Sequence, residues 1–334
     1  MDDSFRTYHS PNCYIGSLAN LIDNIYGTNM FDAFIFFYGN GFKCYYYENA
    51  IANSDFTKIK NIIYHDTFKI LETFCDIYDL SWVVKYGNFN SKNDLLDFLI
   101  ARIEKNHFPI LEINPSYLNY FPSMNSMPRS DQRHAITLIK YSGNIFNISD
   151  CLIPNSFYDN FFNGSIKSRE LKNSWKASGY LYFDFSYDKI KNIDINEILT
   201  NFHDIVMLNI NEYIMEEKNP ISLLIEDLND SLKEVHVNFN MLCTKLSFDI
   251  RYSGLLYSRI YLRKALKYLN YENTDSIDII IKNWRIFCLQ LIKLGIKETD
   301  SELKKLCCFV RQILVEEKDF FRKLLLFFKG SKNV

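Results

Sequence analysis

A cysteine near the start of the chain stands where a helix is predicted to begin. Cys13 follows Pro11 and Asn12, residue types that commonly precede a helix, and it opens the run CYIGSLANLIDNIYG. The unpaired backbone N–H groups and the dipole at a helix amino end favour a thiolate over a thiol. Cys13 is therefore a candidate nucleophile.

A nucleophilic thiolate needs a base, and the base needs a group that fixes its orientation. His134 stands just before the apolar run AITLIKY at 135–141, and Asp150 ends the run IFNISD at 145–150. A Ser-Gly-Asn turn signal at 142–144 separates the two runs. Because such a hairpin brings its two ends together, we expect the side chains of His134 and Asp150 to meet. The predicted chemistry is Cys-His-Asp nucleophilic catalysis.

The hydropathy pattern predicts the elements that position these residues. Apolar residues recur at spacings of three and four from 18 to 25, which predicts an amphipathic helix that Gly27 ends. The same reasoning gives a broken helix at 55–80, a strand at 82–87, a helix at 93–106, a strand at 108–114, a proline-containing loop at 115–133 and a strand at 179–185.

The character of the chain changes near residue 187. Beyond it, apolar residues recur almost continuously at helical spacing, in the segments 194–217, 220–248, 255–270, 275–294 and 300–328. We therefore expect an α+β catalytic domain at 1–187 and a helical domain at 188–334. No repeat of fixed period is visible, which argues against a solenoid.

Composition and charge exclude several classes of protein. The 334 residues are 48% hydrophobic, which is typical of a globular protein. With 38 basic and 40 acidic residues the net charge is -2, so no strong field is present to hold nucleic acid or an anionic membrane. The first residues lack a basic stretch followed by an apolar one, and no apolar run approaches the roughly 20 residues of a membrane span. We expect a cytoplasmic protein with neither partner.

The remaining sequence signals argue against metals, disulfides and nucleotide cofactors. The eight cysteines include no CxxC pair, so neither a zinc site nor a disulfide framework is predicted, and seven of them are interpreted as small buried hydrophobes. No P-loop or dinucleotide fingerprint is present. Amide formation without ATP would then need an acyl donor that is already activated, and a thioester meets that need.

Three motifs in order resemble a papain-like cysteine fold: HSPNCYIGSLANLI, FPILEIN and RHAITLIKYSGNIFNISD. The pattern is similar to bacteriocin-processing peptidase domains and to the amino-terminal domain of the butirosin acyltransferase family, over about residues 5–186. The resemblance implies a papain-like cysteine protease fold with a C-terminal helical region. In that family an acyl group leaves a carrier-protein thioester, rests on the enzyme cysteine and is captured by an amine.

Carried onto this chain, the resemblance makes Cys13 the nucleophile, His134 the base and acid, and Asp150 the orienting group. The partners it implies are an acyl or peptidyl carrier protein, whose phosphopantetheine arm brings the acyl group, and a small amine. No cofactor of its own is expected. The size and layout are also similar to those of a cysteine-protease-like amide synthetase that joins polythioamide acyl chains to 1,3-diaminopropane. The implied role is an ATP-independent amide synthetase of antibiotic biosynthesis.

One departure from the papain-like pattern concerns the oxyanion hole. Papain-like peptidases usually carry Gln about six residues before the cysteine, whereas Thr7 stands there in this chain. The Cys13 backbone N–H remains a donor, and His9, Ser10 and Asn12 are candidates for a second one. The missing Gln argues against proteolysis.

Three alternatives remain open from the sequence. The same triad would serve a cysteine peptidase or another hydrolase. An arylamine N-acetyltransferase also uses Cys, His and Asp with a thioester donor, but the Arg-Gly-Gly stretch that precedes its cysteine is absent here. The third alternative is a non-catalytic binding protein that keeps the fold without the activity.

Overall fold

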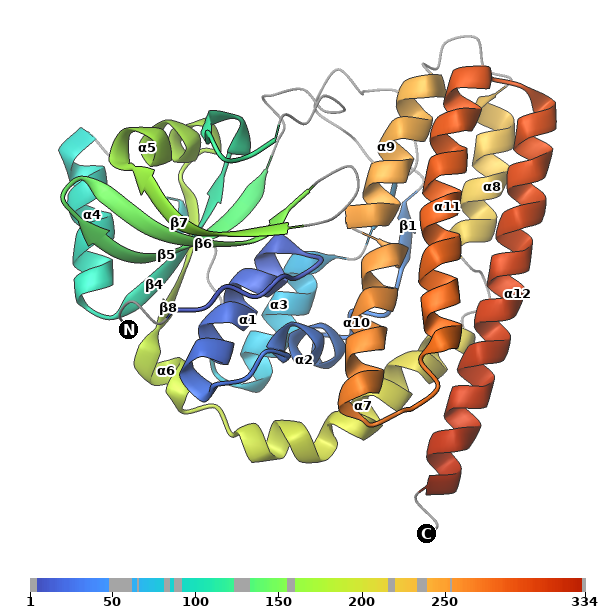
Figure 1. Cartoon of the computed structure of the whole chain (residues 1–334), viewed down its shortest axis with the longest axis horizontal. Coiled ribbons are helices and arrows are strands. Elements are labelled where there is room, and N and C mark those ends of the chain that lie inside the picture. Colours follow the sequence, from blue (N-terminus) through green and yellow to red (C-terminus); the bar gives the residue numbers. More distant parts are fainter. Residues whose placement is uncertain are drawn as a thin grey trace. The chain divides into compact units, whose positions relative to one another are not determined.

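The structure is a computed structural model in which residues 5–47, 62–64, 66–80, 85–86, 92–122, 133–154, 160–215, 220–232, 239–252 and 254–331 are described. It divides into two compact units (Figure 1). One comprises Met1–Ile35 and Phe68–Asn196, and the other comprises Phe36–Thr67 and Glu197–Val334. The chain thus changes unit three times: within helix α2 (Phe31–Tyr38), after Thr67 and after Asn196. The catalytic and helical domains at 1–187 and 188–334 stay a prediction.

The first unit is built on a six-stranded sheet in the order β3-β8-β4-β5-β6-β7, in which every neighbouring pair is antiparallel. Its strands are β3 (Lys85–Tyr86), β4 (His107–Ile113), β5 (His134–Ser142), β6 (Ile145–Ile153), β7 (Asn160–Lys167) and β8 (Leu181–Ser186). The predicted strands at 108–114 and 179–185 are confirmed as β4 and β8. Only 85–86 of the predicted strand at 82–87, and neither 55–61 nor 123–132, lie among the described residues.

The hairpin of β5 and β6 is confirmed, and a two-residue turn explains it. Ser142 pairs with Ile145, so that only Gly143 and Asn144 lie between the strands. Both turn residues have positive φ, 56° and 70°, as a type I′ turn requires. Glycine and asparagine tolerate that left-handed conformation better than most other residues. The turn therefore fixes the register that carries Asp150 back toward the start of β5.

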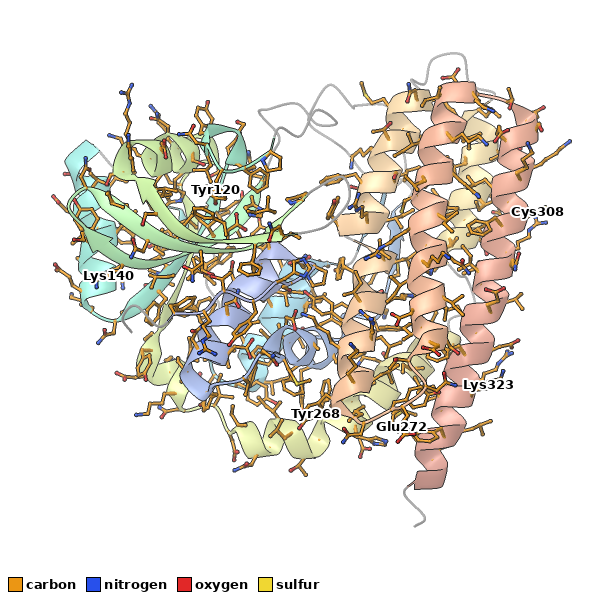
Figure 2. The ribbon with its side chains drawn as sticks, viewed as in Figure 1. Tyr120, Lys140, Tyr268, Glu272, Cys308 and Lys323 are labelled. Carbon is orange, nitrogen blue, oxygen red and sulfur yellow. The ribbon has the colours of Figure 1, made fainter. Side chains whose placement is uncertain are left out.

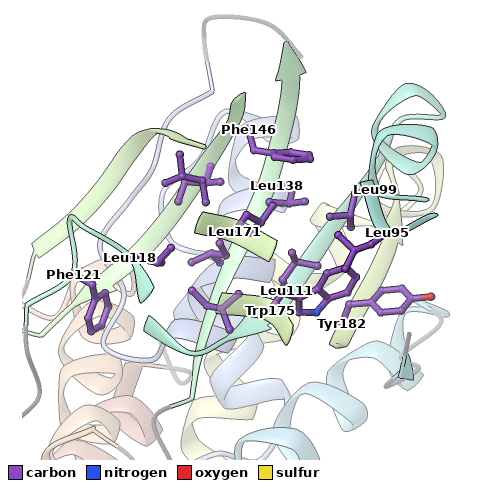
Figure 3. Close-up of a cluster of buried hydrophobic side chains, with 14 residues drawn as sticks. Leu95, Leu99, Leu111, Leu118, Phe121, Leu138, Phe146, Leu171, Trp175 and Tyr182 are labelled. Atoms are coloured by element: carbon purple, nitrogen blue, oxygen red, sulfur yellow. The ribbon is translucent and has the colours of Figure 1, made fainter. Parts of the chain in front are cut away.

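Helices cover both faces of this sheet. The helices α4 (Lys92–Glu104) and α5 (Ser168–Ala177) pack on one face, whereas α1 (Cys13–Tyr26) packs on the other (Figure 1). Side chains alternate between the faces along each strand, so Ile136 and Leu138 of β5 point into a core with Leu99 of α4 and Trp175 of α5 (Figure 3). The helix α1 packs against the opposite face of β5.

The second unit is helical apart from a short pair of strands, β1 (Tyr45–Tyr47) and β2 (Ile62–Tyr64). The helix α11 (Asp275–Lys297) packs against α9 (Phe239–Tyr252), α10 (Leu255–Tyr268) and α12 (Asp300–Ser331). The remaining helices of this part of the chain are α7 (Ile195–Met215) and α8 (Pro220–Ser231). The predicted helical segments are confirmed over their described residues, which in 220–248 form two helices, α8 and α9. Residues 216–217 and 233–238 of these predictions lie outside the described residues.

A buried ion pair lies in the core of the helical unit. The Arg259 guanidinium donates from Nε and Nη2 to the two carboxylate oxygens of Glu317, at 2.7 and 2.6 Å. Tyr213 and Trp284 donate to the same carboxylate at 2.9 and 3.1 Å. The Arg259 guanidinium also lies over the ring of Phe42, 4.9 Å from its centroid. A buried charge pair of this kind is tolerated because its hydrogen bonds are satisfied.

Several elements were not predicted from the sequence. The apolar run at 31–38 was interpreted only as packing, and it forms α2 with its phenylalanines buried. Strand β7 and helix α5 were also missed, as were the short α6 (Tyr187–Lys191) and the 3-10 turn η1 (Pro115–Tyr117). The broken helix predicted at 55–80 includes α3 (Thr67–Ile77) but is wrong at 62–64, which form strand β2. In the described ranges, none of the helices is both long and apolar enough to cross a bilayer.

Candidate active site

Cys13 is the first residue of α1, as predicted, and local interactions place it there. The Asn12 side chain caps the helix by accepting hydrogen bonds from the backbone N–H groups of Tyr14 and Ile15, both at 3.0 Å. Gly27 ends the helix with a φ of 69°. The Cys13 side chain is a free thiol at the edge of the core, with the residue 9% exposed.

The structure brings the three predicted residues together. His134 opens β5, and its Nε2 atom lies 2.8 Å from Oδ1 of Asp150 on β6. The same imidazole is hydrogen bonded to the Cys13 side chain. Because Nε2 faces Asp150, Nδ1 is the ring nitrogen left for the thiol. Both His134 and Asp150 are almost entirely buried, at 2% and 0% exposed.

Asp150 is held by more than the histidine. The Tyr120 hydroxyl donates to Oδ2 at 2.9 Å, and the Leu152 backbone N–H donates to Oδ1 at 3.1 Å. Tyr120, labelled in Figure 2, follows η1 and stacks on Phe162 with ring centroids 4.0 Å apart and an interplanar angle of 6°. Three donors and a fixed aromatic ring thus orient the carboxylate that orients His134. Sequence reasoning missed Tyr120 because it lies in the stretch predicted only as a loop.

The charges around His134 favour its protonated form. Burial lowers the pKa of the imidazole, but the negative charges of Asp150 and Cys13 outweigh that effect and raise the pKa to about 10. The protonated ring is therefore favoured at neutral pH, between the side chains of Asp150 and Cys13. Phe121 covers it at a ring-centroid distance of 4.8 Å. Such an imidazolium can stabilise a thiolate and donate a proton to a leaving group.

Cys151, which follows Asp150, lies directly under the nucleophile. Its Sγ donates to the carbonyl oxygen of Cys13 at 3.4 Å, and burial together with the charge of Asp150 raises the pKa of its thiol well above the ordinary value. A Cβ atom built on Gly16 would lie 2.5 Å from that sulfur. Cys151 is therefore a packing residue where α1 approaches β6 closely.

The residues that precede Cys13, among them the predicted oxyanion-hole donors, make the following contacts. The Thr7 hydroxyl donates to Oγ of Ser149 at 2.9 Å in the core, so it contributes to packing. Asn12 uses its side-chain oxygen for the helix cap. His9 is half-buried, and the Ser10 backbone N–H donates to the Cys151 carbonyl at 3.0 Å. Which of His9, Ser10 and Asn12 assists the Cys13 N–H stays a prediction.

A second polar cluster, not foreseen from the sequence, adjoins the triad. The Tyr14 hydroxyl donates to Oε2 of Glu112 at 2.5 Å, and Nε of Arg133 lies 3.2 Å from Oε1. Tyr14 is the chain neighbour of Cys13, and Arg133 is the chain neighbour of His134. Burial raises the pKa of Glu112, although Tyr14 and Arg133 oppose the shift. The sequence signal that could have revealed this cluster was the single acidic residue within the buried strand FPILEIN.

Among the described residues, no group of three or more His, Cys, Asp and Glu side chains is arranged to hold a metal ion. The site is therefore described by its thiol, its imidazole and its carboxylates.

Comparison with known proteins relates this part of the chain to one family. Residues 12–151 match the sequence model of a family described as Butirosin biosynthesis protein H, N-terminal. The matched segment contains Cys13, His134 and Asp150 but covers less than half of the 334 residues. A search of curated proteins finds no match. The family match supports the resemblance to the butirosin acyltransferases over this segment.

Proposed function

We propose that the protein is a thiol-dependent acyltransferase that forms an amide bond without ATP. An acyl group passes from a carrier-protein thioester to Cys13 and from Cys13 to an amine, as a step of antibiotic biosynthesis. The observation that carries the proposal is the convergence of Cys13, His134 and Asp150. That these residues lie in the segment that matches the butirosin family supports it further.

The first half of the reaction loads the enzyme. The Cys13 thiolate attacks the thioester carbonyl, a new C–S bond forms, and the phosphopantetheine sulfur leaves with the proton of the His134 imidazolium. Thioester exchange is nearly balanced in energy, so no other driving force is required. Asp150 holds the imidazole in the orientation that aims its other nitrogen at the sulfur.

The second half releases the product. The amine nitrogen attacks the acyl-Cys13 carbonyl, the C–N bond forms, and the C–S bond to Cys13 breaks. His134, now neutral, takes a proton from the nitrogen and returns to the imidazolium that accompanies the Cys13 thiolate. The amide is more stable than the thioester, which makes this half favourable.

The proposal extends to the fold and to the substrates. A helix that begins at the nucleophilic cysteine and a strand that begins at the histidine support a papain-like catalytic domain at 1–187. The helical domain at 188–334 would receive the carrier or cover the acyl chain. By resemblance in size and layout, the acyl chain is a polythioamide and the amine 1,3-diaminopropane, as in closthioamide biosynthesis.

The test is acylation followed by release. Purified protein is incubated with an acyl-loaded carrier protein, or with an acyl thioester of N-acetylcysteamine, and intact mass is recorded with and without 1,3-diaminopropane. We expect an acyl adduct on the wild type that disappears as amide when the amine is added.

Two variants make this test specific. Cys13→Ala is expected to lose the adduct, whereas Cys308→Ala, which removes an exposed cysteine of α12 (Figure 2), is expected to keep it. An adduct that persists in Cys13→Ala would remove Cys13 from the mechanism. Free acid as the sole product in the presence of the amine would favour the hydrolase instead.

A further inference from the structure

Glu112 is a buried carboxylate that the mechanism above does not use, and this inference rests on the proposed function. On β4, Glu112 pairs with Ala135 while Ile113 pairs with His134. Because side chains alternate between the two faces along a strand, Glu112 points to the α1 side of the sheet, away from the core that holds Leu111 and Ile113. It is 7% exposed there.

The side chains that contact Glu112 belong to the residues next to Cys13 and His134 in the sequence. Its two oxygens accept from Tyr14 and from Arg133, the neighbours in sequence of Cys13 and His134. The pKa of Tyr14 is raised by burial, then by the charge of Glu112 and then by that of Cys13. The phenol thus lies close enough to the thiol for their charges to interact.

The carboxylate can accept further hydrogen bonds. A carboxylate offers about four lone-pair positions, and the two side-chain donors seen here use one position on each oxygen. Arg133, whose side chain is 41% exposed, favours the ionised form of Glu112 in the absence of a ligand. Together with Tyr14, Arg133 thus opposes the effect of burial, which raises the pKa of this carboxyl group.

Aromatic rings lie against Tyr14, which donates a hydrogen bond to this carboxylate. The Tyr14 ring lies edge-on to Phe68 of α3 at a centroid distance of 5.2 Å and to Phe183 of β8 at 6.1 Å. Phe68 and Phe183 are themselves 6.0 Å apart, and Phe68 is 41% exposed. A carboxylate beside aromatic surface is the combination that recognises an alkylammonium group, through its charge, its N–H donors and its carbon chain.

We propose that Glu112 and Tyr14 form the acceptor site, in which the ammonium group of a primary alkylamine is bound and deprotonated next to acyl-Cys13. The ammonium nitrogen loses two protons in this step, and two different bases accept them. Glu112 takes one proton from R–NH3+, and the neutral R–NH2 attacks the acyl carbonyl. His134 takes a second proton from the nitrogen as the C–N bond forms and the C–S bond breaks. Glu112 then releases its proton to solvent, and the imidazolium remains beside the Cys13 thiolate.

The test separates acylation from release. Wild type, Glu112→Gln and Tyr14→Phe are acylated with the N-acetylcysteamine thioester, and the rate of adduct formation is measured by mass. The adducts are then treated with 1,3-diaminopropane or with hydroxylamine, which is largely uncharged at neutral pH. Glu170→Gln, a carboxylate of the same unit that bonds to Asn119, is the matched control.

We expect Glu112→Gln to be acylated within about twofold of wild type but to release amide with the diamine ~10²-fold more slowly, the scale of a lost general base. Release by hydroxylamine is expected to change little, because that nucleophile needs no deprotonation. Tyr14→Phe is expected to show a smaller loss with the diamine, and Glu170→Gln none.

Each other outcome identifies which proposal fails. A wild type that forms no acyl-Cys13 overturns the proposed function and this inference with it. An acylated Glu112→Gln with unchanged diamine release overturns the acceptor site alone. A loss of acylation, or equal losses with both nucleophiles, also overturns it and makes Glu112 a support for α1 and β5. If Glu112→Gln does not fold, unchanged diamine release by Tyr14→Phe overturns it.

Discussion

His134 is the residue whose environment decides the chemistry of the site. It is buried between a thiol and a carboxylate, and Asp150 is itself fixed by Tyr120 and by the Leu152 N–H. The pKa of the imidazole is raised from its ordinary value of 6.5 to about 10. The stability that the protonated ring contributes is therefore fully present below pH 6.5 and is lost as the pH rises through about 10. The protonated state needed for acylation is lost over the same upper range.

A pH profile of acylation tests this assignment. In Asp150→Asn the strongest influence that raises the pKa of His134 is removed, so the decline of acylation at high pH is expected to move to lower pH. The rate at neutral pH is expected to fall by ~10²-fold or more, because the orientation of the imidazole is also lost. The measurement is the initial rate of adduct formation between pH 6 and pH 10.5, compared with wild type. A variant whose decline stays at the wild-type pH would contradict the role given to Asp150.

At the scale of elements, the approach of α1 to β6 positions Cys13. The helix comes so near that only a glycine fits at position 16, between Ser10 and Cys151. A Cβ atom there would lie 2.4 Å from Cβ of Ser10 and 2.5 Å from Sγ of Cys151. Relief of that overlap would require the helix, and Cys13 with it, to move.

The substitution Gly16→Ala tests the tight approach. We expect a loss of about 1–3 kcal/mol in the free energy of unfolding, typical of overpacking, together with slower acylation of Cys13. Gly330→Ala on α12 is the control, since a Cβ atom there meets nothing within 4 Å and alanine is the better helix former. Chemical denaturation and acylation rates are the measurements. A Gly16→Ala protein as stable and as active as Gly330→Ala would contradict the packing argument.

At the scale of the whole molecule, each compact unit has its own buried core. That of the helical unit includes the pair of Arg259 and Glu317, with Tyr213 and Trp284 completing the hydrogen bonds of the carboxylate. The pKa of Arg259 is lowered by burial, but Glu317 more than compensates and raises it above the ordinary value. A pair of this kind is costly to break because one charge would remain buried alone.

A substitution that removes one charge of the Arg259–Glu317 pair tests how much the pair contributes to stability. Glu317→Gln leaves the Arg259 guanidinium uncompensated, and we expect a loss of ~3–5 kcal/mol in the free energy of unfolding. The neighbouring Glu316→Gln is the control, because Glu316 is only half-buried and bonds to Asn283 and Gln312. Its effect is expected to stay below about 1 kcal/mol. Urea denaturation followed by circular dichroism measures both, and equal stabilities would refute the prediction.

The helical unit also includes an early part of the chain. Residues 36–67 group with the helical unit although they precede His134 by a long stretch of chain. The segment is rich in aromatic residues, and its Phe42 lies under the Arg259 guanidinium. Membership of a core depends on contacts between residues that are distant in sequence, so local composition does not indicate which residues join it.

Local sequence determined the parts of the site that depend on neighbouring residues. The Asn12 cap places Cys13 at the first turn of α1, and the Gly-Asn turn returns Asp150 toward His134, because capping and turn geometry involve only a few adjacent residues. Tertiary structure alone decided the rest. Tyr120 reaches Asp150 across 30 positions, Tyr14 reaches Glu112 across 98, and Cys151 packs under Cys13 across 138. Such pairs leave no periodic signal in the sequence, since they arise only when separate elements pack together.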